Sequence, residues 1–171
     1  MPRPAPNDAP EFFHRYINCT NGNSLSEVMT NHTAELKEFY NSLPDDKADY
    51  AYAPGKWTIK NLLQHIIDAE RIFAYRTLRI ARKDTTPLAG FDENMYAENA
   101  NAGGRTLQSL KDEFNAVRSS TDMLLGSLNE DQLSATGTAS NKSITANAIA
   151  FVIFGHLLHH KAIIKERYLT Q

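Results

Sequence analysis

Apolar residues recur at helical spacing along four separate stretches of the chain. The first stretch begins at Ser24, which precedes Glu27 in the S-x-x-E relation of a capping box, and it ends before Pro44. Its apolar stripe, which includes one histidine, is Leu25, Val28, Met29, His32, Leu36, Phe39, Tyr40 and Leu43. This repeat of three to four residues predicts an amphipathic helix over 24–43.

The other three stretches show the same period. Thr58 and Thr106 can cap helices over 59–82 and 107–128, and Ser143 can cap a last helix that runs to the C-terminus. Four long helices with little strand signal and no internal repeat predict an all-α fold. We expect a four-helix bundle, formed by residues 24–171 as a single domain.

Two regions lie outside these stretches. Residues 1–10 contain four prolines, so residues 1–23 are expected to form an N-terminal extension with a short helix over 11–19. Residues 83–105 lack a strong period, and connections of this length in a compact domain are often functional. Phe91, Met95 and Tyr96 indicate that part of this connection is a short helix folded back over the core.

Charge and composition exclude several function classes. The 171 residues carry 18 basic and 20 acidic side chains without a basic stripe, which argues against nucleic-acid binding. The longest apolar run, near 149–158, is interrupted by Gly155 and His156, so we expect no membrane span. The proline-rich start is unlike a signal peptide, and Cys19 is the one cysteine. These features predict a cytoplasmic protein.

The candidate chemistry lies in the histidines of the last predicted helix. His156 and His160 are one turn apart on a stripe that is otherwise aliphatic, so both imidazoles can reach one metal ion. Spacing alone leaves two alternatives, a metal site or core histidines with hydrogen-bond partners. His65, on the inward side of the second helix, can complete a set of three ligands. Three protein ligands leave a position open, as in catalytic sites.

The other histidines are weaker candidates. His159 points about 60° away from His156 on a helix, so we place it at the rim of a pocket or on the surface. His32 lies on an inward stripe and is a weaker fourth ligand. His14 shows no feature that indicates a metal ligand.

Three segments carry a resemblance to a known family. APGKWTIKNLLQHIIDAERIFAYRTLRIARKD, PLAGFDENMYAENAN and FGHLLHHKAIIKERYL resemble the DinB/YfiT-like superfamily, in particular its DinB_2 branch. The resemblance covers residues 24–168 and combines G-K-W before the second helix, a histidine within it, and G-H-x-x-H-H near the end. It implies an up-down-down-up bundle with a divalent metal, often nickel or zinc, held by His65, His156 and His160.

The resemblance also implies several functions. Characterised relatives transfer or isomerise small molecules with low-molecular-weight thiols such as bacillithiol, mycothiol or glutathione, others are named only as metal-dependent hydrolases, and many are homodimers. We therefore expect a metal-dependent thiol S-transferase with a thiol co-substrate and a small-molecule substrate. The alternatives are a metal-dependent hydrolase and a non-catalytic metal- or ligand-binding, stress-related protein. A degenerate bundle without metal is disfavoured by the intact histidine set.

Candidate catalytic residues flank the predicted metal ligands. Asp68, one turn after His65, can orient an imidazole, and Glu93 and Tyr96 can overhang the pocket from the 83–105 connection. Ordinary surface polarity is the alternative for all three. A second apolar face on the last helix contains Phe151, Phe154 and Leu158, which predicts contact with the first and third helices or with a second copy of the chain.

Overall fold

The computed structural model describes residues 1–170 and contains four long helices where the apolar pattern predicts them. They are α2 (Leu25–Asn41), α3 (Ile59–Ala81), α5 (Leu107–Gly126) and α7 (Ala146–Arg167). The predicted caps form, because the hydroxyls of Ser24, Thr58 and Thr106 each accept a hydrogen bond, at 3.1–3.2 Å, from the backbone N–H three residues later. The four-helix bundle is thus confirmed.

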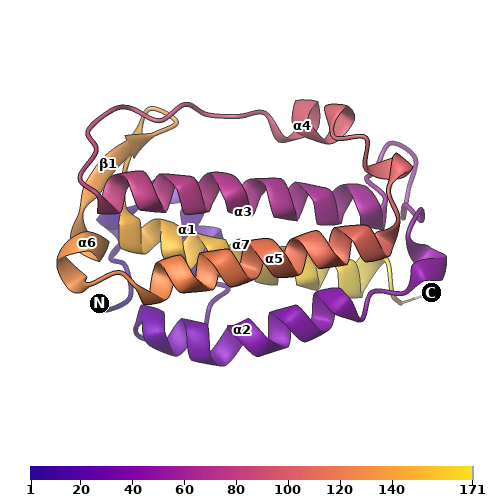
Figure 1. Cartoon of the computed structure of the whole chain (residues 1–171), viewed down its shortest axis with the longest axis horizontal. Coiled ribbons are helices and arrows are strands. Elements are labelled where there is room, and N and C mark those ends of the chain that lie inside the picture. The colour runs from indigo at the N-terminus through magenta and orange to yellow at the C-terminus, as the bar shows by residue number, and fades with distance from the viewer. Residues whose placement is uncertain (171) are drawn as a thin grey trace.

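The four long helices do not simply alternate in direction along the chain (Figure 1). In that view α2 and α7 run from left to right, whereas α3 and α5 both run from right to left. Helices α2 and α3 each pack against α5 and α7. Because α3 and α5 are parallel, the chain between them must return along the whole length of the bundle, and it carries α4 (Glu93–Asn99) over one face of α3.

Short elements fill the remaining segments. In chain order they are η1 (Pro6–Asp8), α1 (Glu11–Ile17), η2 (Asp45–Lys47), η3 (Ala102–Gly104), α6 (Glu130–Ser134), β1 (Thr136–Ala139) and β2 (Lys142–Thr145). Helix α1 is the short helix expected in the N-terminal extension, and it ends at Ile17. Helix α4 is the short helix expected within 83–105, and it leaves Met95 and Tyr96 exposed while Ala97 is buried.

The hairpin of β1 and β2 corrects the prediction for residues 136–145. Ser143 lies within β2 and does not cap the last helix; Thr145 does, accepting a hydrogen bond from the Ala148 N–H at 3.1 Å. The strands pair antiparallel through a turn at Ser140 and Asn141, both with positive φ. Leu88 pairs with the other edge of β1, so the long connection and the hairpin form one unit.

Helix α7 is the central helix of the molecule. It packs against α1, α2 and α3, and Phe151 and Phe154 are fully buried within the chain. Contrary to the expectation from sequence, α7 is long and apolar enough to cross a membrane by length and composition, but 72% of the relevant window is buried inside the protein. Burial against neighbouring helices accounts for its apolar character. Homodimer formation and cytoplasmic location stay predictions.

Helix α1 approaches α7 very closely at Gly155. A Cβ atom at this position would lie 1.9 Å from the Tyr16 carbonyl oxygen and 2.4 Å from the Tyr16 carbonyl carbon. Only glycine permits this contact between backbones. The N-terminal extension therefore packs tightly on the helix that carries the histidines.

Candidate metal centre

Three histidines converge where α3 packs against α7. His65 comes from α3, and His156 and His160 lie one turn apart on α7. The Nε2 atom of His156 lies 3.1 Å from the Nε2 atoms of both His65 and His160. One ring nitrogen from each residue falls within 4.8 Å of the others. The structure thus brings together the three residues that the sequence selected; metal binding by them stays a prediction.

Two of the spacings between ring nitrogens, from His156 to His65 and from His156 to His160, fit a shared cation. Imidazole nitrogens bound at about 2.0–2.1 Å to one tetrahedral or octahedral ion lie about 2.9–3.4 Å apart. Hydrogen bonding explains the cluster less well, because the His156 Nε2 has either one hydrogen or one lone pair and faces two ring nitrogens. In addition, the His160 Nδ1 is buried without a hydrogen-bond partner among residues 1–170.

Burial keeps these imidazoles neutral. Desolvation lowers the pKa of His65 to about 4 and that of His160 to about 3. The pKa of His156 is well below its usual value of 6.5, first through burial and then through the charges of His160 and His65. All three therefore present lone pairs at neutral pH, the form that binds a metal.

The cluster lies at a pocket with a volume of about 710 Å³. Much of its wall is aromatic and comes from Phe12, Phe13, Tyr16, Trp57, Phe73 and Phe91. The Trp57 ring centroid lies 4.8 Å from that of His65, and the Tyr16 ring centroid lies 5.4 Å from that of His156. A small organic molecule can therefore reach the histidines through a mainly apolar space.

The remaining histidine candidates lie outside the cluster. His159 lines the pocket, half-buried, with its ring centroid 5.3 Å from that of Tyr16, as expected for a residue at the rim. His32 is buried on α2, where its Nε2 accepts a hydrogen bond from the Asn21 N–H at 2.9 Å. His32 is therefore a hydrogen-bonded core residue.

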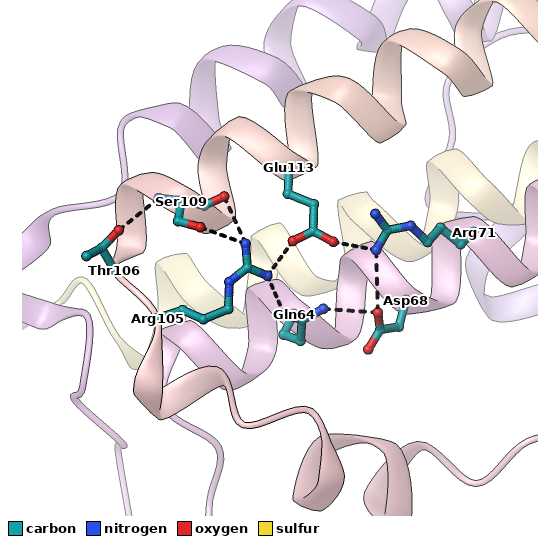
Figure 2. A network of polar contacts seen from close by, with 7 residues as sticks. All are labelled: Gln64, Asp68, Arg71, Arg105, Thr106, Ser109 and Glu113. Carbon is teal, nitrogen blue, oxygen red and sulfur yellow. Dashed lines mark hydrogen bonds and ion pairs between the residues drawn. The ribbon is translucent and has the colours of Figure 1, made fainter.

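Asp68 does not reach the histidines, which corrects its expected role (Figure 2). Its Oδ1 accepts a hydrogen bond from the Gln64 Nε2 at 3.0 Å and lies 3.8 Å from the Arg71 Nη1. Arg71 and Arg105 both pair with Glu113 on α5, so these side chains form a network between α3 and α5. The physical reason is helical rotation, since a residue three positions after His65 is turned about 60° away from it and meets Gln64 and Arg71 on the same helix.

The two candidates on α4, Glu93 and Tyr96, lie in different hollows. Glu93 lines the pocket, and its charge opposes the lowering of the His65 pKa. Tyr96 contacts Phe91, with ring centroids 5.3 Å apart, and lines a second, smaller hollow together with Asp68. Of the three weak candidates, the structure brings only Glu93 to the histidine pocket.

Sequence reasoning missed the contribution of the N-terminal extension. Phe12, Phe13, Arg15 and Tyr16 of α1 form one wall of the pocket. The aromatic residues of this short segment indicated an apolar face, but the sequence did not show which part of the protein that face contacts. Arg76, which the sequence did not single out as a site residue, is buried and lines the same pocket.

Comparison with known proteins identifies the family. The model of the DinB superfamily matches residues 29–164. A Bacillus pumilus protein named "Putative metal-dependent hydrolase" is 26% identical over 146 residues, which is 82% of this chain and 83% of that protein. An Oceanobacillus iheyensis protein with the same description is 34% identical over 74 residues, and the match spans only 42% of its length.

Solved structures confirm the architecture. YfiT from Bacillus subtilis, described as a probable metal-dependent hydrolase with an unusual four-helix bundle topology, superposes with a TM-score of 0.70 at 21% identity over 95% of this chain and 89% of that one. A mycothiol-dependent maleylpyruvate isomerase superposes with a TM-score of 0.64 at 14% identity, over 91% of this chain and 60% of that one. At these identities the likeness shows a shared fold.

Proposed function

This chain belongs to the DinB superfamily, and from that membership and its histidine cluster we propose that it is a metal-dependent hydrolase acting on a small organic substrate. The observation that carries the proposal is the convergence of three neutral imidazole nitrogens at the wall of a 710 Å³ pocket. Both sequence relatives described above are named for this activity, which supports hydrolysis over the thiol transfer that the resemblance first favoured.

The residues of the site have separate roles in this proposal. His65, His156 and His160 would hold a divalent ion such as zinc or nickel. When bound, such an ion polarises a carbonyl group and lowers the pKa of water toward neutrality. Glu93, one of two carboxylates that line the pocket, would accept a proton there, and the aromatic walls would exclude bulk water from the substrate.

Thiol transfer is the alternative within the same site. The three protein ligands leave room for a thiolate as well as for water, and the fold is shared with an isomerase that depends on mycothiol. A non-catalytic binding protein would keep the same histidines but show no turnover.

The experiment is a turnover assay on tag-free protein reconstituted with zinc or nickel. We expect hydrolysis of 4-nitrophenyl esters and small amides without added thiol, lost on chelation and in His65→Ala. His14→Ala removes a histidine outside the cluster and controls for general imidazole catalysis, so it should leave the rate unchanged. Turnover that requires glutathione or bacillithiol would favour the transferase, and ester cleavage unaffected by chelation would contradict a metal-dependent mechanism.

A further inference from the structure

The pocket contains a buried positive charge that the three-histidine site does not use. Arg76 lies on α3 with 4% of its surface exposed, and it lines the pocket. Burying a charge is costly unless an opposite charge or a full set of hydrogen bonds compensates for it. Its surroundings therefore show whether the protein itself supplies that compensation.

Arg76 differs from the other buried cationic residues. Within residues 1–170 the buried lysines and arginines are Lys60, Arg76, Lys111, Arg118 and Lys161. The other four each lie within 4.0 Å of a carboxylate oxygen. Arg76 has no such ion pair among these residues. The carboxylates that share its pocket, Glu11 and Glu93, are exposed and make no ion pair with it.

The hydrogen bonds of Arg76 leave part of the guanidinium group unused. Its Nη2 donates to the Ala89 carbonyl oxygen at 2.7 Å and to the Ser140 Oγ at 3.1 Å. These two acceptors, from the long connection and from the turn of the hairpin, fix the group in place. The Nε and Nη1 N–H groups have no acceptor among residues 1–170, although a guanidinium group has five N–H donors to satisfy. Phe91 covers the group at 5.9 Å from its ring centroid.

Arg76 and the histidine cluster lie on the same side of α3. Eleven residues separate Arg76 from His65, which is about three turns, or about 16 Å along the helix. Phe73 lies between them, with its ring centroid 5.7 Å from that of His156 and 6.1 Å from that of Phe13. Along α3 the pocket therefore runs from the buried Arg76 past the aromatic Phe73 to the histidines.

We propose that Arg76 is an anchoring site for a carboxylate, and that the substrate is an amphiphilic monocarboxylate whose apolar body lies over Phe73 with its reactive group at the histidines. Three cations line the pocket, and Arg15 and Lys142 are exposed to solvent whereas Arg76 is buried. The one buried charge matches a single carboxylate, and its free N–H groups supply hydrogen bonds to the carboxylate oxygens. The position of the reactive group rests on the proposed hydrolase function; the anchoring of the carboxylate does not.

Calorimetric titration with a matched pair of ligands tests the anchor. The full chain, as purified and after chelation, is titrated with 4-phenylbutyrate and with the neutral 4-phenylbutyramide. We expect the carboxylate to bind about 10- to 150-fold more tightly than the amide, the range for hydrogen bonds to a charged group. In Arg76→Gln this ratio should fall close to one while amide binding is retained. Arg82→Gln, which removes an exposed arginine from the end of the same helix, should keep the wild-type ratio.

The opposing outcomes are distinct. No carboxylate binding at millimolar concentration, an equal affinity for both ligands, or an unchanged ratio in Arg76→Gln would overturn the proposal. A preference that disappears on chelation but persists in Arg76→Gln would place the carboxylate on the metal and would likewise overturn it. Because binding is measured without turnover, a chain that hydrolyses nothing can still show the Arg76-dependent ratio.

A measurement on the wild-type chain covers the case in which Arg76→Gln does not fold. The Nε–H resonance of Arg76 is then followed by NMR during the two titrations. A large shift with the carboxylate and a small one with the amide is expected, and equal shifts would overturn the proposal.

Discussion

Replacing Gly155 by alanine should detach the N-terminal helix from the bundle while leaving the histidines in place. The added Cβ would lie 1.9 Å from the Tyr16 carbonyl oxygen, far inside van der Waals contact. No side-chain rotation relieves this clash, because the atoms it meets belong to the backbone of α1. The whole helix must therefore move away from α7, and the pocket loses the wall that contains Tyr16.

The cost follows from two opposing contributions. Overpacking of this kind costs about 1–3 kcal/mol or somewhat more, whereas alanine in a helix gains about 1 kcal/mol over glycine. We expect a net loss of about 2 kcal/mol, which lowers the Tm of a chain of this size by about 4–8 °C. Since α1 is a local element on the outside of the bundle, the core helices should remain folded.

Thermal unfolding, limited proteolysis and calorimetry form the assay. Gly155→Ala should melt earlier, be cleaved faster between residues 8 and 24, keep its metal and bind 4-phenylbutyramide more weakly. Gly126→Ala is the matched control, since its Cβ would meet no atom within 4 Å at the end of α5, and it should be neutral or slightly stabilising. Equal stability and equal ligand affinity in Gly155→Ala and the wild type would refute the reasoning.

Three further predictions concern the histidines and the buried charges. His156→Ala should lower metal affinity by more than about 100-fold, which exceeds the effect of removing a residue that only contacts a ligand. His159→Ala should lower it by less than about tenfold. Equal losses in competition titrations would contradict the ligand assignment. The metal-free chain should lose stability as pH falls from 6.5 toward about 4, because unfolded histidines bind protons in this window and the buried ones do not; a flat profile of urea midpoints would argue against neutral, buried imidazoles. Arg118→Met should destabilise the chain by about 3–5 kcal/mol because Glu70 is left buried without its partner, whereas Arg71→Met on the surface should cost less than about 1 kcal/mol; similar urea midpoints for both would contradict this.

The bundle and the histidine cluster could be predicted because both depend on helical periodicity. The apolar stripe that begins at Leu25 and the capping residues Thr58 and Thr106 are features of neighbouring residues in the sequence. They correctly predicted where three of the four long helices begin. His156 and His160 share a face wherever the helix forms. Their meeting with His65 required only that α3 and α7 pack together, which the family resemblance implied.

The hairpin could not be predicted because its turn lacks the usual sequence signal. Ser140 and Asn141 both adopt positive φ, a turn type that most often contains Asn-Gly or Asp-Gly. The strands have four residues each, and β1 is supported by the distant Leu88 as well as by β2. Pairing between segments about fifty residues apart leaves no trace in local periodicity.

The pocket walls depended on contacts of the same long-range kind. Arg76 follows the pattern of a solvated arginine along α3, and it is buried only because the long connection and the hairpin meet above it. Tyr16 becomes part of the site through the close approach at Gly155. The predicted role of Asp68 was wrong because three residues fall short of a full helical turn, so its side chain meets Gln64 and Arg71 and not the histidines.

Metal content of tag-free protein, measured by mass spectrometry on the wild type beside His65→Ala, tests the central claim most directly. The account predicts close to one divalent ion per wild-type chain, zinc or nickel, and almost none in the variant, with both chains equally helical. A wild-type chain that takes up no metal even after reconstitution, or a variant that retains as much as the wild type, would contradict the three-histidine metal centre.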